Sequence, residues 1–308
     1  MNLSVGLVGL PNAGKSTLFN ALLSRQIADV APYPFCTIEP NKGVVEVPDE
    51  RLAKLARVVQ TAKVVPAVVE FIDIAGLVKG AAQGQGLGNQ FLAHIRECGV
   101  IVHVLRAFTD PNVCRETALN PEDDLAIVQT ELELADLQTL EKQKAPAQNL
   151  PFLLANKPAL YVLNINESDL GKTFDSKFIP ICAKIEMELA ELEIEERRAY
   201  LQELGLKKSG LEKLIQAAYQ LLGLQTFLTA GIKEVRAWTI NKGIQAPQEA
   251  GVIHTDFEKG FIKAKVINWQ EFIKYEGWKG AAEIGKLRLE GRDYVMQEGD
   301  VVEFMVNC

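Results

Sequence analysis

The residues best suited to chemistry lie near the start of the chain, at positions 9–16. They read Gly-Leu-Pro-Asn-Ala-Gly-Lys-Ser and match the pattern G-x-x-x-x-G-K-[ST] at every defined position. Glycines in such a loop let backbone amides wrap a β-phosphate, and the positive end of the following helix adds to the attraction. A glycine turn that matches by chance is the alternative, but an apolar run precedes this loop and helical spacing follows it. We therefore predict that the loop binds a nucleotide.

Two side chains of this loop have a defined chemical role. We expect Lys15 to neutralise charge on the β- and γ-phosphates, and Ser16 to ligate Mg²⁺. Neighbouring residues supply further contacts because the whole loop surrounds the phosphates. The predicted nucleotide-binding residues of this segment are Asn12, Ala13, Gly14, Lys15, Ser16 and Thr17.

A second group suited to metal binding follows an apolar run that ends at Asp73. The sequence there is Asp-Ile-Ala-Gly, so the carboxylate of Asp73 can reach a Mg²⁺ ion and the amide of Gly76 can contact a γ-phosphate. This pattern is common by itself and gains weight from the loop upstream. The hydroxyl of Thr37, in a proline-rich segment, is a candidate to complete the metal shell, although an isolated Thr reads as structural. The predicted metal ligands are Ser16, Thr37 and Asp73.

Alternating apolar and amphipathic runs must position these groups. Short apolar runs typical of buried strands lie at 3–8, 43–47, 68–73, 100–105, 161–166 and 178–183. Helical spacing separates most of them, at 17–24, at 49–59, from 121 onward, at 186–203 and at 209–222. This order predicts an α/β domain with a mostly parallel sheet.

The rhythm of the sequence changes after about Leu224. Strand-like runs at 234–240, 260–267 and 301–306 then enclose only short helical pieces, near 269–275 and 281–284. The pattern predicts a separate α+β domain. A chain of 308 residues also fits two domains at roughly 150 residues each. We place these domains at 1–221 and 222–308.

Charge and cysteine content exclude several classes of protein. The formal net charge is −7, so non-specific nucleic-acid binding is disfavoured and any such contact needs a local basic patch. The five cysteines are scattered without a CxxC pair, which fits neither a disulfide framework nor a thiolate zinc site. The uncharged stretch 214–232 contains glutamines, threonines and glycines, and the N-terminus lacks a basic region. We expect a cytoplasmic protein with no membrane contact.

Five motifs give the sequence a family resemblance. From the first strand to the last they are GLPNAGKST, PFCTIEPN, DIAGLVKGA, GQGLGNQFL and HTDFEKGF. With them the chain resembles the YchF family of Obg-related P-loop NTPases, also called Obg-like ATPases. The resemblance implies a Mg²⁺-dependent ATPase that associates with the ribosome, with a TGS-like C-terminal domain of β-grasp fold.

Residues 164–167 bear on the choice of base. GTP-specific relatives carry Asn-Lys-x-Asp here, whereas this chain has Asn-Ile-Asn-Glu. The missing Lys and the longer Glu break the guanine clamp, and an Asn amide can pair with the N6 and N7 edge of adenine. We expect Asn164 to read adenine; a GTPase of the same scaffold and a plain polar turn are the alternatives. The nucleotide contacts expected in this half of the domain are Asn164, Asn166, Glu167, Cys182 and Ala183.

The sequence offers little catalytic help beyond the loop. Leu77 stands where Ras-like enzymes carry the Gln that orients water, and Cys114 aligns with a His of relatives, so slow turnover is expected. Asn12 matches a position that binds K⁺ in other enzymes lacking that Gln; an Asn that only shapes the loop is the alternative. His94 and His103 read as structural. The predicted catalytic residues are Asn12, Lys15, Thr37 and Gly76.

Two further features concern partners. Relatives insert a helical arm where this chain has only about twenty residues between Lys142 and Leu160, so the first domain is interrupted near 126–157 by an arm that is naturally short or missing. Three lysines of the C-terminal domain can meet RNA phosphates, although a solvated strand face is the alternative: Lys259, Lys263 and Lys265. The predicted function is slow hydrolysis of ATP that resets a ribosome-associated switch. The rival is an ATP-gated ribosome or RNA adaptor with incidental turnover.

Overall fold

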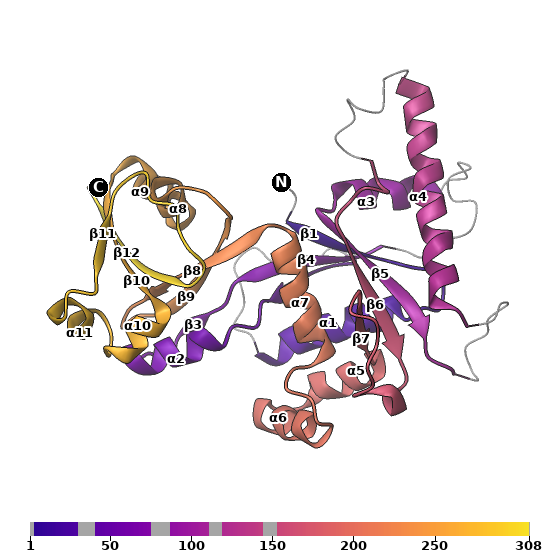
Figure 1. Cartoon of the computed structure of the whole chain (residues 1–308), viewed down its shortest axis with the longest axis horizontal. Helices are drawn as coiled ribbons and strands as arrows, with labels where there is room; N and C mark the ends of the chain where they lie inside the picture. The colour runs from indigo at the N-terminus through magenta and orange to yellow at the C-terminus, as the bar shows by residue number, and fades with distance from the viewer. Residues whose placement is uncertain (1–2, 30–40, 75–86, 111–118, 144–152, 308) are drawn as a thin grey trace. The chain divides into compact units, whose positions relative to one another are not determined.

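The computed structural model describes residues 3–29, 41–74, 87–110, 119–143 and 153–307. The chain divides into two compact units. The first comprises residues 1–45 and 69–222, and the second comprises residues 46–68 and 223–308. Figure 1 shows the elements of both.

The first unit is built on a six-stranded sheet with the order β2-β4-β1-β5-β6-β7. Its pairs β1–β4, β1–β5, β5–β6 and β6–β7 are parallel, which confirms the prediction of a mostly parallel α/β sheet. Parallel strands covered on both faces read as continuous apolar runs, and all five residues of β1 are buried. The strands are β1 (Ser4–Val8), β2 (Lys42–Glu46), β4 (Val68–Asp73), β5 (Val100–Ala107), β6 (Ala159–Ile165) and β7 (Phe178–Ile181).

Helices cover both faces of this sheet. Figure 1 shows α3 and α4 on one face and α1, α5 and α7 on the other. Two buried clusters match this layering, one joining the sheet to α3 and α4, and one joining it to α5 and α6. The helices are α1 (Lys15–Asp29), α3 (Leu87–Glu97), α4 (Pro121–Gln143), α5 (Ala183–Glu191), α6 (Ile194–Glu203) and α7 (Gly210–Leu221).

The single helix predicted at 186–203 is wrong, because the structure divides it into α5 and α6. Leu192 ends α5 in an extended conformation. Glu193 then begins α6 with a capping box. The Glu193 side chain accepts a hydrogen bond from the backbone amide of Glu196, and the Glu196 side chain accepts one from the backbone amide of Glu193. The helical spacing of apolar residues continues across the break, so periodicity alone did not reveal it.

The short connection expected in place of the helical arm is tied down at its far end. Asp136 of α4 accepts hydrogen bonds from the backbone amides of Leu154 and Ala155, both at 2.9 Å. Asp136 and Leu154 are buried, so this contact holds the segment that precedes β6 against α4.

The second unit has a six-stranded sheet with the order β11-β10-β12-β8-β9-β3. Its C-terminal strands are β8 (Leu224–Ala230), β9 (Val235–Asn241), β10 (Phe261–Asn268), β11 (Arg288–Glu290) and β12 (Asp300–Val306). One apolar cluster joins β8, β9, β10 and β12 to α8 (Ala246–Ile253) and α9 (Thr255–Lys259), while α10 (Trp269–Lys274) and α11 (Trp278–Glu283) are short. This is the α+β unit that the change of rhythm after Leu224 predicts.

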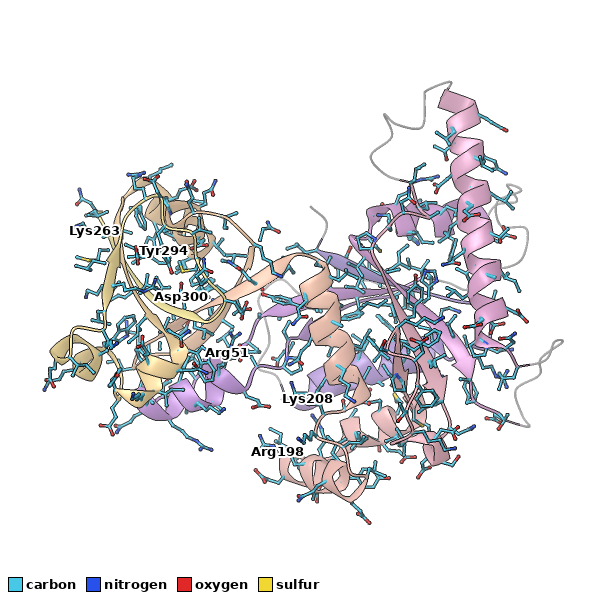
Figure 2. The ribbon with its side chains drawn as sticks, viewed as in Figure 1. Arg51, Arg198, Lys208, Lys263, Tyr294 and Asp300 are labelled. Atoms are coloured by element: carbon cyan, nitrogen blue, oxygen red, sulfur yellow. The ribbon has the colours of Figure 1, made fainter. Side chains whose placement is uncertain are left out.

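Residues 46–68 belong to this second unit, which corrects the assignment of 1–221 to one domain. Asp49 caps α2 (Glu50–Val59) as expected, but the following β3 (Val64–Val65) pairs in parallel with β9. Arg51 binds Asp49 at 2.7 Å and Glu298 at 2.5 Å (Figure 2). The periodicity of a strand–helix–strand pattern is the same whichever sheet its strands join. The sequence therefore did not reveal that residues 46–68 join the second unit.

Candidate nucleotide-binding site

The loop at 9–16 connects β1 to α1, as its motif requires. Two of its glycines are needed because other atoms lie too close for a side chain. A Cβ added at Gly9 would lie 2.4 Å from the Val104 carbonyl oxygen. Gly14 has a φ of +89°, and an added Cβ would lie 2.2 Å from Nδ2 of Asn164. The loop is therefore held closely by β5 and β6.

Lys15 is buried at the first position of α1. Its Nζ donates to the carbonyl oxygens of Gly9 and Leu10, both at 2.9 Å, and so lies within the curve of the loop. Burial lowers the pKa of Lys15, while the negative charge of Asp73 opposes that effect. A concentrated positive charge inside the loop is the arrangement that a phosphate-binding lysine requires.

Ser16 and Asp73, two of the predicted metal ligands, lie in contact. The hydroxyl of Ser16 donates to Oδ2 of Asp73 at 2.9 Å. The other carboxylate oxygen, Oδ1, is buried and has no hydrogen-bond partner among the described residues. A hydroxyl and an unsatisfied carboxylate oxygen side by side are hard oxygen donors that suit Mg²⁺. Thr37 and Gly76, the other predicted contacts, lie outside the described residues, as do Leu77 and Cys114.

Asn164 joins the phosphate loop to the first residue of α5, just after β7. Its Nδ2 donates to the carbonyl oxygen of Ala13 at 3.1 Å, and its Oδ1 accepts from the amide of Ala183 at 3.1 Å. The side chain of Asn164 is buried, and the position of this residue near the end of β6 explains why it reaches both partners. The structure thus gives Asn164 a bracing contact that its expected role as a base reader did not include.

A cavity of about 1000 Å³ opens beside the phosphate loop. It lies where the carboxyl ends of β5, β6 and β7 meet, the usual position of ligand sites in parallel sheets. Of the predicted nucleotide contacts, the lining includes Gly14, Thr17, Asn164, Asn166, Glu167, Cys182 and Ala183. The structure therefore brings the two halves of the predicted site together.

Several predicted residues have contacts of their own at this cavity. Oδ1 of Asn166 accepts from the amide of Thr109 at 3.3 Å. Glu167 lies 4.0 Å from Nζ of Lys184, and both side chains are exposed. Burial raises the pKa of the Cys182 thiol. Asn12 adopts a φ of 62° in the phosphate loop, a left-handed conformation that Asn tolerates.

Sequence reasoning missed part of the lining. Phe108, Thr109 and Asp110 follow β5, Lys184 follows the predicted Ala183, and Leu204 lies just after α6. A signal was present for the first three, because residues directly after a parallel strand beside the phosphate loop lie at the binding edge of the sheet. Leu204 carries no such signal, since its position depends on the break between α5 and α6.

Neither His94 nor His103 lines the cavity. His103 of β5 is buried and stacks on Tyr161, with ring centroids 5.4 Å apart. Burial lowers the pKa of His103 to about 4, so the ring is neutral near pH 7. His94 lies in α3. The prediction that His103 is structural agrees with this packing.

Comparison with known proteins agrees with both units. One family model, described as a 50S ribosome-binding GTPase, matches residues 4–164; another, the YchF-GTPase C-terminal family of unknown function, matches residues 224–307. The ribosome-binding ATPase YchF of Escherichia coli O157:H7 is 45% identical over 364 aligned positions that cover both chains completely. This chain belongs to the YchF family. The ribosome-binding ATPase YchF of Bacillus subtilis is 44% identical, again with full coverage of both chains.

A solved structure agrees with the family assignment. The YchF GTPase of Schizosaccharomyces pombe superposes with a TM-score of 0.82 at 33% identity, covering 99% of this chain and 98% of that chain. The alignment with the E. coli relative has 364 positions whereas this chain has 308 residues, so 56 positions are gaps in this chain. A shortened arm would leave such gaps, and their location near 126–157 remains a prediction.

The described residues contain no helix that is both long and apolar enough to cross a membrane. The uncharged stretch 214–232 is divided between α7 and β8, so it does not form one continuous helix.

Proposed function

We propose that this protein is a Mg²⁺-dependent ATPase that hydrolyses ATP to ADP and phosphate and acts as a slow switch. The observation that carries the proposal is the unsatisfied Oδ1 of Asp73 beside Ser16, next to a phosphate loop that encloses Lys15 and borders a cavity of about 1000 Å³. Each part suits one part of Mg²⁺-ATP: the carboxylate the metal, the loop the phosphates and the cavity the nucleoside.

The phosphate end of the reaction depends on three side chains. Lys15 exchanges its two carbonyl partners for β- and γ-phosphate oxygens when ATP enters. Ser16 and Asp73 would hold Mg²⁺, which would offset the negative charge of the phosphates. Thr37 and the amide of Gly76 are proposed to complete the contacts to the metal and the γ-phosphate.

The base end is proposed to favour adenine. No lysine is present in residues 164–167 to complete a guanine clamp. Phe108 supplies a ring for stacking, while Asn166 and Glu167 supply polar atoms at the rim. Asn164 braces Ala13 and Ala183, and its remaining N–H and lone pair are available for the N6 and N7 edge.

We also propose K⁺ as an activator held by Asn12. A cation between the β- and γ-phosphates would stabilise the charge that develops during transfer, in place of the absent glutamine. Asn12 is exposed on the phosphate loop, where a cation can approach it.

The ribosome is the proposed partner, in the cytoplasm, because the bacterial relatives described above are named ribosome-binding ATPases. RNA contact through the second unit is the weaker part of this proposal. Lys265 is paired with Glu303 at 2.7 Å, which leaves Lys259 of α9 and Lys263 of β10 (labelled in Figure 2) as the better phosphate contacts. The second unit is proposed to be TGS-like.

Turnover assays test the enzymatic proposal. Purified protein should release phosphate from ATP in the presence of Mg²⁺ faster than from GTP, with stimulation by K⁺ over Na⁺. Absence of ATP-dependent phosphate release, or equal use of GTP, would overturn it. Co-sedimentation with ribosomes, with ATP, ADP or a non-hydrolysable analogue, tests the switch: binding that ignores the nucleotide would contradict it.

A further inference from the structure

Arg106 is a buried charge close to the cavity that none of the roles above uses. It lies near the end of β5, directly opposite Asn164 in the register between β5 and β6, and is only 6% exposed. Burial of a guanidinium is costly unless its surroundings compensate, so the position calls for an explanation.

The contacts of Arg106 lead to Phe108. The guanidinium carbon lies 4.7 Å from the centroid of the Phe108 ring, within the range of a cation–π interaction. Nε of Arg106 also donates to the carbonyl oxygen of Phe108 at 3.2 Å. One side chain thus holds both the ring and the backbone of the first residue after β5.

The Phe108 ring is placed to meet the nucleoside. It lines the cavity, whereas Arg106 does not. A Cβ added at Gly14 would lie 3.8 Å from Cε1 of Phe108, so the ring borders the phosphate loop on the cavity side. A half-buried aromatic residue beyond a strand end would sample several rotamers without a fixed neighbour.

We propose that Arg106 is a positioning residue that holds the Phe108 ring in the orientation that stacks on the purine of the bound nucleotide. The inference rests on the proposed function, since it requires a purine nucleotide in this cavity. The cation on the ring and the bond to its backbone carbonyl restrict the ring before binding, which reduces the entropy lost when the base stacks.

The experiment compares two ligands on the full chain by calorimetry: Mg²⁺-ATP, which carries a base, and Mg²⁺-tripolyphosphate, which does not. Phe108→Leu should weaken ATP binding roughly 10- to 100-fold, the range for base–aromatic stacking, and leave tripolyphosphate binding unchanged. Arg106→Gln should weaken ATP binding roughly 3- to 30-fold, also without effect on tripolyphosphate. Arg106→Lys, which keeps a cation, should fall between wild type and Arg106→Gln.

The double variants separate positioning from a general structural role. With Phe108→Leu already present, Arg106→Gln or Arg106→Lys should cost no further ATP affinity, because there is no ring left to orient. In turnover assays of the single variant Arg106→Gln, KM for ATP should rise while kcat stays unchanged. The matched control is Arg236→Gln, which removes a guanidinium 4.8 Å from the ring of Trp238 in the second unit and should change neither ligand's affinity.

The outcomes distinguish this inference from the proposed function. If the wild type binds no Mg²⁺-ATP, the proposed function fails. If the wild type binds Mg²⁺-ATP and Arg106→Gln or, should that variant not fold, Arg106→Lys binds it equally well, the inference alone fails. Equal weakening of ATP and tripolyphosphate, or a further loss of ATP affinity in the double variant, would also overturn it.

Discussion

Asp73 in the first unit and Asp300 in the second are both held by polar neighbours, but in opposite ways. Asp73 accepts one hydrogen bond from Ser16 and leaves Oδ1 without a partner among the described residues. Asp300 is 2% exposed and accepts at both oxygens, from Nη2 of Arg288 at 3.2 Å, from the hydroxyl of Tyr294 at 2.6 Å and from the amide of Gln297 at 3.0 Å (Figure 2). A saturated carboxylate organises structure, whereas one with a spare oxygen is suited to a cation.

Glu249, in the same unit as Asp300, is a carboxyl group in a third kind of environment. It is completely buried in α8, and neither of its carboxyl oxygens has a hydrogen-bond partner among the described residues. Burial and the negative charge of Asp300 raise the pKa of Glu249 to about 8. Glu249 is therefore mostly protonated near pH 7, which avoids a buried negative charge. Of the three, only Asp73 combines an unsatisfied oxygen with the hydroxyl of a phosphate loop.

The largest expected effect belongs to the first unit. Lys15→Ala should lower ATP turnover by about 1,000-fold, because it removes the cation that neutralises the transferring phosphate. Steady-state phosphate release measures this. Unfolding of the second unit should be unaffected, and turnover within tenfold of the wild type would contradict the role of Lys15.

Asp300→Asn should affect the second unit and not the first. Breaking this buried cluster should lower the free energy of unfolding by about 3 kcal/mol, because Arg288 and Tyr294 lose their charged partner. All three tryptophans of the chain, at 238, 269 and 278, lie in the second unit, so their fluorescence during urea unfolding reports on it alone. ATP affinity should not change; a loss there would break the contrast between the two carboxylates.

The buried carboxyl of Glu249 predicts a pH dependence in the second unit. Its folded pKa of about 8 lies above its ordinary value of 4.5, so the folded state keeps a proton that the unfolded chain releases. This stabilising term is complete below pH 4.5 and is lost as the pH rises through 8. The free energy of unfolding should fall by about 2 kcal/mol between pH 6 and 7.5.

Tryptophan fluorescence across this pH range tests that slope. Glu249→Gln, which cannot ionise, should show a flat profile, with Glu258→Gln on α9 as an exposed control that keeps the wild-type slope. A wild-type profile that is itself flat would show that Glu249 is ionised or solvated in the folded state.

A smaller effect should come from Asn164→Ala. It removes the two hydrogen bonds that join Ala13 to Ala183, which should weaken ATP binding about tenfold. Asn166→Ala, at the rim, serves as the comparison and should cost less. A loss of affinity for tripolyphosphate as well as ATP is expected for Asn164→Ala, since the contact braces the phosphate loop.

Much of the first unit could be predicted because its signals are local. The phosphate loop, the apolar strands and Asp73 at a strand end all follow from short stretches of sequence. Apart from the local break between α5 and α6, what failed depended on contacts between distant residues. The placement of 46–68 depends on pairing of β3 with β9, and the bracing role of Asn164 depends on carbonyl and amide groups of two other loops.

The missed residues of the cavity have the same cause. Phe108 and Leu204 lie almost a hundred positions apart, and both are apolar residues with no chemical motif. The parallel order of β5, β6 and β7 brings Phe108, which follows β5, to the carboxyl edge of the sheet, whereas the position of Leu204 depends on the break between α5 and α6. Their role follows from topology and not from residue type.

The most direct test of the account is a calorimetric titration of ATP, with Mg²⁺ and with EDTA, into the wild type and Asp73→Asn. We predict that Mg²⁺ strengthens ATP binding to the wild type and that the variant, which keeps an oxygen for Ser16 but has lost its charge, loses most of this gain. ATP binding that ignores Mg²⁺ in the wild type, or an equal Mg²⁺ dependence in Asp73→Asn, would contradict the claim that the spare oxygen of Asp73 serves the metal.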